Sequence, residues 1–287
     1  MLRTKFSVFV ILFVLSMLVP GKTLAATPPP LTAAADAGAD DALAAAAQNP
    51  VASMYSLPLE FTFDLGADDG DASILNIQPV IPVTMGDWNY ISRIIVPLLD
   101  LNGNSAGIPS IPNGTTGSGD VSGLGDINYT LFLSPVRAGK VIWGVGPSVS
   151  FPTATDEKLG SEKYSAGPSA VFLTQPKPWT LGLLVRNLWS FAGESDRKSV
   201  NQFLAQPFVN YNLDKGWYLT SQPVITANWN ADSGDRWTIP VGGGVGKIMK
   251  IGNQPVNIRL ASYWNADKPD GGPDWSIVFA FQLMFPK

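Results

Sequence analysis

The sequence predicts an all-β protein, an antiparallel transmembrane β-barrel of about twelve strands with short periplasmic turns and longer extracellular loops. Three observations predict this class. The chain begins with an export signal, it is poor in charged residues and has no cysteine or histidine, and it repeats a strand whose apolar face lies between two tryptophans. An exported chain of amphipathic strands points to the outer membrane of a Gram-negative bacterium.

The N-terminus carries the three parts of a secretory signal peptide. Arg3 and Lys5 form a basic region, residues 6–19 form an apolar core, and Thr23-Leu24-Ala25 is a small-residue cleavage site. The core is shorter than the ~20 residues that a spanning helix needs, so an uncleaved anchor is the weaker alternative. No later stretch is apolar enough for a transmembrane helix. We expect residues 1–25 to be the signal peptide.

Residues 26–52 are rich in alanine, proline and aspartate. This composition favours a disordered periplasmic linker. The alternative is an N-terminal plug, in which residues 40–48 form a short helix and the segment folds back into the barrel. The barrel itself is expected over residues 53–287.

The composition excludes several classes of function. Charged residues make up 15% of the chain, whereas about 25% is usual in soluble domains. The absence of cysteine and histidine excludes disulfide scaffolds, thiol catalysis and His/Cys metal sites, and we expect no metal and no cofactor. A net charge of -4 argues against a nucleic-acid partner.

The hairpin at residues 200–229 shows the strand pattern most clearly. In its second strand, the odd positions from Trp217 to Trp229 are mostly apolar and the even positions are mostly polar. Successive strand side chains point to opposite faces. At ~3.3 Å per residue and a tilt of ~40°, the two tryptophans lie roughly 30 Å apart across the membrane, close to its hydrocarbon thickness. This pattern is typical of a transmembrane barrel strand.

The same alternation predicts twelve strands, at residues 53–64, 74–85, 88–99, 126–134, 140–151, 163–173, 178–190, 200–212, 216–229, 236–246, 255–265 and 274–285. The lumen-facing candidates for a solute path are Glu60, Asp64, Gln78, Arg93, Arg186, Gln206, Gln222 and Arg259. Charges in a membrane-spanning wall are costly unless they face water or each other, so bracing ion pairs and solute contact are both open. The predicted membrane-interface aromatics are Trp143, Trp179, Trp189, Trp217, Trp229, Trp264 and Trp275.

The connections between the strands separate by charge. With the N-terminus in the periplasm, the connections that follow the even-numbered predicted strands are periplasmic turns, and they are basic. The connections that follow the odd-numbered strands are extracellular loops, which are longer and acidic. The acidic rim could bind lipopolysaccharide through divalent cations, could favour entry of cations, or could simply be solvated. The glycine-rich loop at residues 100–125 either folds inward as a constriction or stays at the surface.

Prolines recur in mid-strand, where they cannot donate to a ladder and a closed barrel has no free edge. Five of them are predicted to face lipid: Pro79, Pro147, Pro168, Pro207 and Pro223. The expectation is a band of β-bulges in the wall, with the neighbouring carbonyls left to glutamine amides or to lumen water.

Several motifs resemble a known bacterial family. They are Gly146-Pro147-Ser148, Phe151-Pro152-Thr153-Ala154-Thr155, residues 206–212, Gly216-Trp217-Tyr218, residues 240–246 and residues 271–275, with Gln48-Asn49-Pro50 and Ser56-Leu57-Pro58. The family comprises outer-membrane transporters associated with the MetA pathway of phenol degradation, many of which carry the misleading label "neuromedin U". The resemblance covers most of residues 48–287. It implies an outer-membrane barrel that takes up aromatic or other hydrophobic compounds, and it supplies no site residues.

Three functions are open for such a barrel. Twelve strands lie between the filled eight-stranded barrel and the open sixteen-stranded pore, which favours a narrow channel or transporter for passive uptake of small, aromatic or hydrophobic compounds. The alternative is a structural or adhesive barrel with a filled lumen. A barrel enzyme such as a lipid hydrolase is the weakest hypothesis, because the chain has no histidine to act as a base.

The expected partners are the lipid bilayer, lipopolysaccharide, a small-molecule solute and the barrel-assembly machinery. The chain departs from the usual terminal aromatic of assembled barrels, because Phe285 is followed by Pro286 and Lys287. Every strand has a face compatible with lipid, which favours a monomer.

Overall fold

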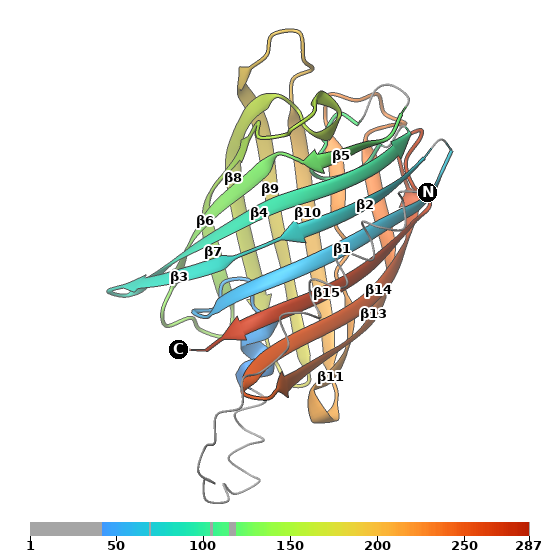
Figure 1. Ribbon diagram of the computed structural model, residues 1–287. Coiled ribbons are helices and arrows are strands. Elements are labelled where there is room, and N and C mark those ends of the chain that lie inside the picture. Colours follow the sequence, from blue (N-terminus) through green and yellow to red (C-terminus); the bar gives the residue numbers. More distant parts are fainter. Residues whose placement is uncertain (1–41, 69, 104–105, 115–118, 287) are drawn as a thin grey trace, which may run out of the picture. The chain divides into compact units, whose positions relative to one another are not determined.

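The computed structural model describes residues 42–286 apart from residues 69, 104–105 and 115–118, all within one compact unit. One antiparallel sheet of fifteen strands closes on itself, because β9 pairs with β10 and β1 pairs with β15 (Figure 1). The strands are β1 (Tyr55–Ala67), β2 (Gly70–Ile77), β3 (Val80–Met85), β4 (Trp88–Gly103), β5 (Val121–Leu124), β6 (Ile127–Pro135), β7 (Ile142–Phe151), β8 (Lys163–Thr174), β9 (Trp179–Gly193), β10 (Asn201–Asn212), β11 (Trp217–Ser221), β12 (Ile225–Asn228), β13 (Trp237–Ile251), β14 (Gln254–Asp267) and β15 (Trp275–Phe285). The described residues also form a short helix at 42–47 and the 3-10 turns η1 (Glu157–Leu159) and η2 (Asp214–Gly216).

The fifteen strands make twelve passes through the wall. Both β2 and β3 lie between β1 and β4, β5 and β6 both pair with β4, and β11 and β12 both lie between β10 and β13, so each of these pairs is one interrupted pass. The predicted twelve-stranded antiparallel barrel is therefore confirmed. Tyr55 pairs with Phe285, so β1 begins and β15 ends at the same end of the barrel. This end carries the short turns, and we call it the periplasmic end.

Several strands are longer than predicted. The prediction placed a loop at residues 65–73, but β1 and β2 run to a tight hairpin there. It also placed a turn at residues 247–253, whereas β13 continues to Ile251. Lys247 lies in this stretch, and its ammonium is 4.8 Å from the ring centroid of Trp217. A long lysine side chain can stay in a strand when its charge reaches the interface over an aromatic ring.

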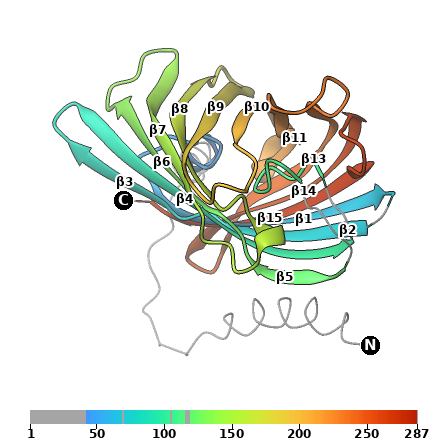
Figure 2. The same cartoon turned by 90° about the horizontal axis from the view of Figure 1, so that it is seen from above.

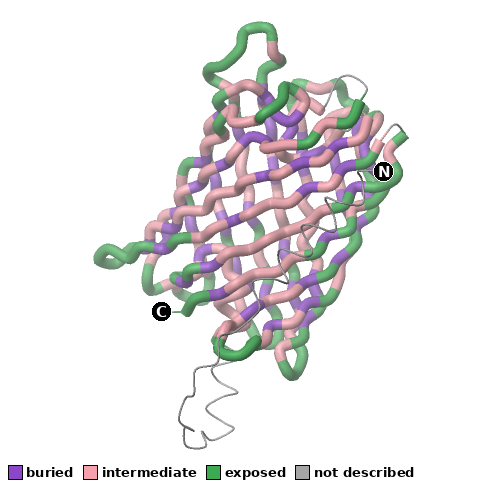
Figure 3. The backbone as a smooth tube through the Cα atoms, in the orientation of Figure 1, coloured by how far each residue is buried: buried purple, intermediate pink, exposed green. Residues whose placement is uncertain are grey.

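The two faces of the wall follow the predicted period of two. Along β1, Phe63 and Leu65 are exposed on the outer face, whereas Asp64 between them is buried in the barrel. Figure 3 shows buried positions recurring along the strands between less buried ones, with exposed positions mainly near the strand ends and in the loops. The exposed outer face is apolar, which suits lipid rather than water. Within the described residues, no helix is long and apolar enough to cross a membrane.

Tryptophans lie near both ends of the strands. Six of the seven predicted interface residues are exposed, namely Trp179, Trp189, Trp217, Trp229, Trp264 and Trp275. Trp143 is half-buried, with its ring 6.1 Å from that of Trp88, a tryptophan that the prediction did not include. At the opposite end Trp264 is paired with Trp275 across β14 and β15. This arrangement matches the two aromatic girdles of membrane barrels.

The prediction of β-bulges at the wall prolines is wrong for most of them. Pro147 pairs with Pro168 and Pro207 pairs with Leu183 without a shift of register. A register shift does occur beside Pro240, between β13 and β14. A proline removes only its own N–H from the ladder, so a strand can continue past it without an inserted residue.

Two other prolines interrupt their strands. Pro79 lies between β2 and β3, and Pro223 lies between β11 and β12. The register on the far side of each break continues the register before it. The side chains of Gln78 and Gln222 next to these prolines bond to other lumen side chains rather than to the ladder.

Candidate solute pathway through the barrel

The eight predicted lumen residues line one cavity inside the barrel. This upper cavity has a volume of about 200 Å³. The eight residues, Glu60, Asp64, Gln78, Arg93, Arg186, Gln206, Gln222 and Arg259, reach it from seven separate passes of the wall. The alternation of strand side chains is sufficient to direct them inward. Their placement agrees with the prediction, and their contact with a solute stays a prediction.

A second cavity of about 170 Å³ lies on the periplasmic side and shares lining residues with the first. The shared residues are Glu60, Gln78, Arg93, Leu184, Gln206, Gln222 and Arg259. We call this set, in which every residue except Leu184 is polar, the polar layer. Because the layer borders both cavities, a solute that passes along the lumen must cross it.

The polar layer contains one ion pair. The Arg259 Nη2 lies 2.5 Å from Glu60 Oε2, which joins β14 to β1 across β15. Arg93 instead donates from Nη2 to the neutral Oε1 of Gln78 at 2.6 Å. The Glu60–Arg259 pair therefore braces the wall, whereas Arg93 has no carboxylate partner among the described residues.

Other predicted lumen residues differ in their contacts. Asp64 accepts a hydrogen bond from Ser276 Oγ at 2.5 Å, and Gln222 donates from Nε2 to Asn210 Oδ1 at 3.1 Å. Arg186 has a buried Nε with no hydrogen-bond partner among the described residues. An arginine in this state is uncommon, because a buried donor without a partner is costly.

The segment before β1 lies inside the periplasmic end of the barrel. Val51 is buried in an apolar cluster with residues of five strands, including Phe132 and Leu184, and Met54 packs with Tyr218. The Nε2 of Gln48 donates to Asn212 Oδ1 at 2.7 Å. Figure 2, viewed along the barrel, shows this segment in blue within the ring of strands. Residues 1–41, which include the predicted signal peptide, lie outside the described part of the chain.

The extracellular end is narrowed by residues 106–114. Gly107, Pro109 and Pro112 line the upper cavity, and Ile108 and Ile111 are buried against strand residues. Two strand amides hold the loop: Gln202 Nε2 donates to the Pro109 carbonyl at 3.1 Å, and Asn228 Nδ2 donates to the Pro112 carbonyl at 3.0 Å. Of the two alternatives for this loop, the described part folds inward.

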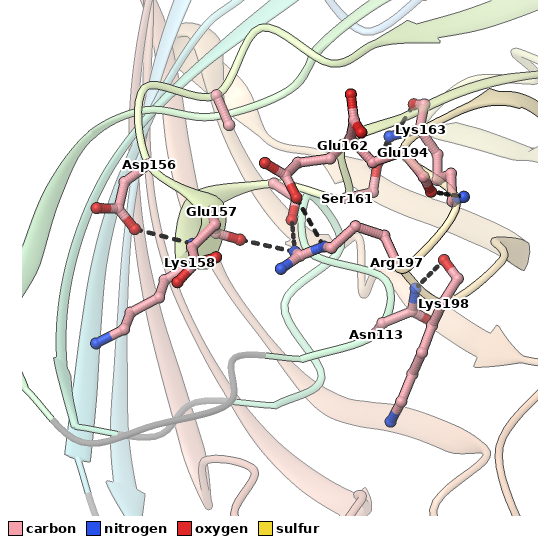
Figure 4. A network of polar contacts seen from close by, with 12 residues as sticks. Asn113, Asp156, Glu157, Lys158, Ser161, Glu162, Lys163, Glu194, Arg197 and Lys198 are labelled. Atoms are coloured by element: carbon pink, nitrogen blue, oxygen red, sulfur yellow. Dashed lines mark hydrogen bonds and ion pairs between the residues drawn. The ribbon is translucent and has the colours of Figure 1, made fainter.

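A network of polar contacts joins two further extracellular loops (Figure 4). Arg197 Nε lies 3.0 Å from Glu162 Oε2, and its Nη2 donates to the carbonyls of Glu157 and Gly160 at 2.7 and 2.9 Å. The Nζ of Lys163 donates to the Glu194 carbonyl. The loop that carries Arg197 is thereby fixed to the loop between β7 and β8.

Sequence reasoning missed several residues of the upper cavity. Asp126 at the extracellular end accepts two hydrogen bonds of 2.7 Å from the N–H and Oγ of Ser161. Asn128, Thr130 and Ser148 form a second buried polar group in the wall, with Thr130 Oγ1 2.8 Å from Ser148 Oγ. Asn128 and Thr130 alternate inward along β6, and this alternation is the signal that could have found them.

A groove on the outer side of the wall lies beside the upper cavity. It is lined by Val145, Pro147 and Pro168, which are exposed on the outer face, and also by Ser169 and Arg186. The last two residues line the upper cavity as well. Ser169 and Arg186 therefore border both the groove and the upper cavity.

The fold resembles that of a solved outer-membrane protein. The COG4313 outer membrane channel from Pseudomonas putida F1 has a TM-score of 0.59 with 15% identity, over 81% of this chain and 96% of that one. The Pseudomonas putida toluene transporter TodX (TM-score 0.44, 10% identity, 84% of this chain and 93% of that one) and the CymD monoaromatic hydrocarbon channel (0.43, 9%, 82% and 89%) are more distantly similar.

The family match agrees with the resemblance found in the motifs. No curated protein matches the chain. Residues 62–246 match the model of the family described as "Putative MetA-pathway of phenol degradation". The chain is an outer-membrane β-barrel that belongs to this family.

Proposed function

We propose that the chain is a channel for passive uptake of small hydrophobic or aromatic compounds across the outer membrane. The observation that carries this proposal is the pair of cavities stacked along the lumen, above and below the polar layer. A barrel with a purely structural role has no need for two such spaces in series. Their volumes suit a ring-sized solute, since an engineered protein cavity of about 150 Å³ holds benzene.

The class of solute is supported by the lining of the upper cavity and by the family. Apolar side chains such as Phe132, Leu184, Leu188 and Val224 line that cavity together with the charged ones. Sites for small molecules combine a mostly apolar wall with a few placed polar groups. The name of the matched family refers to phenol degradation, which is consistent with an aromatic solute.

We infer that residues 42–54 act as an N-terminal plug. The support is the apolar seat of Val51 and the two hydrogen bonds that hold the segment, from Gln48 to Asn212 and from Gln175 to the Ala45 carbonyl. Small apolar residues of the segment, such as Ala46 and Ala47, also pack against the cluster of Met54 and Tyr218. Residues 26–41 would then link the plug to the periplasm after removal of the signal peptide.

A second exit for hydrophobic solutes leads sideways into the membrane. The groove beside Pro147 and Pro168 supports this route, because Ser169 and Arg186 separate it from the upper cavity. A hydrophobic compound gains free energy by entering lipid rather than water.

The proposed channel acts as a monomer, with few partners and without enzymatic activity. We infer a monomer, because exposed apolar residues occur on nearly every pass of the wall. Lipopolysaccharide and the barrel-assembly machinery are the proposed partners outside the bilayer core. The chain lacks histidine and cysteine, which supports a role without enzymatic activity, because histidine most often activates a nucleophile as a base and cysteine often is the nucleophile.

Conductance of the refolded protein in planar bilayers tests the proposal. The mature chain and a variant without residues 26–52 are compared at equal protein density. We expect discrete openings in both, with a larger conductance in the shortened chain. Closed membranes in both forms, from protein whose folding is verified by heat-dependent mobility in SDS gels, would favour the structural barrel with a filled lumen.

A further inference from the structure

Two arginines in the upper cavity form no ion pair with the described residues. Arg93 on β4 donates to the neutral Gln78 at 2.6 Å, and Arg186 on β9 has no hydrogen-bond or ion-pair partner among the described residues. The Nε of Arg186 is also withdrawn from solvent. A guanidinium offers five donors and stays charged, so both side chains retain donors for a ligand.

The carboxylates of the same cavity are already engaged. Glu60 is paired with Arg259 at 2.5 Å, Asp64 accepts from Ser276, and Asp126 accepts from Ser161. None of these acids bonds to Arg93 or Arg186. The fixed positive charge of the two arginines is therefore not cancelled by direct contact within the described cavity wall.

The two arginines share one cavity. Both side chains line it, and Glu60, the acid whose charge acts on Arg93, is itself paired with Arg259. Like charges held together in a poorly solvated site are costly unless an anion lies between or beside them. The arrangement is therefore suited to a bound anion.

An apolar wall adjoins the arginines. Arg93 is opposite Thr130 on β6, and Phe132 lies two residues further along the same inward face. Leu184 lies two residues before Arg186, again on the inward face. Phe132 and Leu184 are buried in one cluster and line the upper cavity. A ligand that contacts both the cations and this cluster must carry a negative group on an apolar body.

We propose that Arg93 and Arg186 bind the carboxylate of a small aromatic acid, with its ring against Phe132 and Leu184. The proposal rests on the proposed channel function and gives it a substrate class, the aromatic carboxylates. Guanidinium groups recognise carboxylates through paired, charge-assisted hydrogen bonds. The cavity volume of about 200 Å³ accommodates one aromatic ring.

Ligand-observed NMR on the refolded protein in detergent tests the site without requiring conduction. Benzoate is compared with benzyl alcohol, which has the ring without the charge, and with acetate and sulfate, which have the charge without the ring. The variants are Arg93→Gln and Arg186→Gln. Arg137→Gln is the matched control, because it makes the same charge change at an exposed turn between β6 and β7. Arg186→Lys keeps the charge in the cavity and serves as a folding control.

We expect benzoate to bind tighter than all three comparison compounds. Each Gln variant in the cavity should weaken benzoate binding by about tenfold or more, since a hydrogen bond to a charged group is lost, whereas Arg137→Gln should leave it unchanged. Equal binding of benzoate and benzyl alcohol would overturn the proposal. Acetate or sulfate binding as tightly as benzoate would also overturn it, by reducing the site to a general anion site.

Reversal potentials in a KCl gradient give the second readout. The wild-type channel should prefer chloride, and the double variant with both cavity arginines replaced should lose that preference. Benzoate binding without any conductance would contradict the channel function and leave the site intact. Conductance without chloride preference and without benzoate binding would contradict the arginine site and leave the channel function intact.

Discussion

Pro147 of β7 lies directly opposite Pro168 of β8, so two residues without a backbone N–H face each other in the barrel wall. Each follows a glycine. A Cβ on Gly146 would collide with the carbonyl oxygen of Leu131, and a Cβ on Gly167 would collide with that of Asn187. The adjacent strands approach so closely here that only glycine fits.

Replacement of Gly146 by alanine should therefore destabilise the barrel. The added methyl group meets backbone on β6, which cannot rotate away as a side chain can, and an overpacked site typically costs about 1–3 kcal/mol. Urea unfolding in lipid vesicles measures the loss. Gly139→Ala is the control, because a Cβ at that position has no atom within 4 Å. Equal stability of the two variants would contradict the close approach.

Replacement of Glu60 by glutamine should leave Arg259 without its carboxylate. The polar layer then gains positive charge, so the preference for chloride in a KCl gradient should rise. The variant should also lose stability, and the double variant Glu60→Gln/Arg259→Gln should recover part of it. We expect a coupling free energy of about 0.5–3 kcal/mol from the double-mutant cycle. Additive effects would mean that the two residues act independently.

Replacement of Val51 by aspartate should release the plug. Val51 is 3% exposed within an apolar cluster, and a charge there is costly without a partner. Single-channel conductance should increase toward that of the chain without residues 26–52. Ser53→Asp is the matched control, since Ser53 is exposed and only two residues away. An unchanged conductance in Val51→Asp would show that the segment does not limit flow.

Replacement of Arg197 by glutamine should loosen the extracellular loops. Arg197 holds Glu162 and two carbonyls of the loop between β7 and β8, so proteinase K should cut residues 152–162 faster in the variant. The overall stability should change little, because exposed ion pairs contribute about 0–1 kcal/mol. Lys198→Gln makes the same change of charge at the next residue. Equal cleavage of both variants would argue against the clamp.

The inward facing of the eight polar residues could be predicted, because it depends only on the side-chain period within each strand. Arg93 and Arg186 needed no knowledge of their neighbours to be placed in the lumen. The hydrogen-bond partners of these arginines could not be predicted. Whether an arginine meets Glu60 or a neutral amide depends on register between distant strands, which one sequence does not specify.

The loop at residues 106–114 shows a different limit. It has no periodicity, and its position depends on two amides, Gln202 and Asn228, from strands far along the chain.

The wall prolines show a third limit. Their strand breaks could be anticipated from the missing N–H, but the pairing across Pro147 and Pro168 without a bulge depends on how closely the neighbouring backbones approach.

The pairing of β1 with β15 has a consequence for the order of assembly. Eleven residue pairs from Tyr55–Phe285 to Leu65–Trp275 form this seam, and every one joins the beginning of the barrel to its end. Contacts of such wide sequence separation carry a large loop-closure entropy and form late. The seam cannot exist until the last strand has been delivered, so a chain that stops before β15 presents two unpaired edges to the membrane. Closure is therefore a single terminal event, and it requires the entire chain.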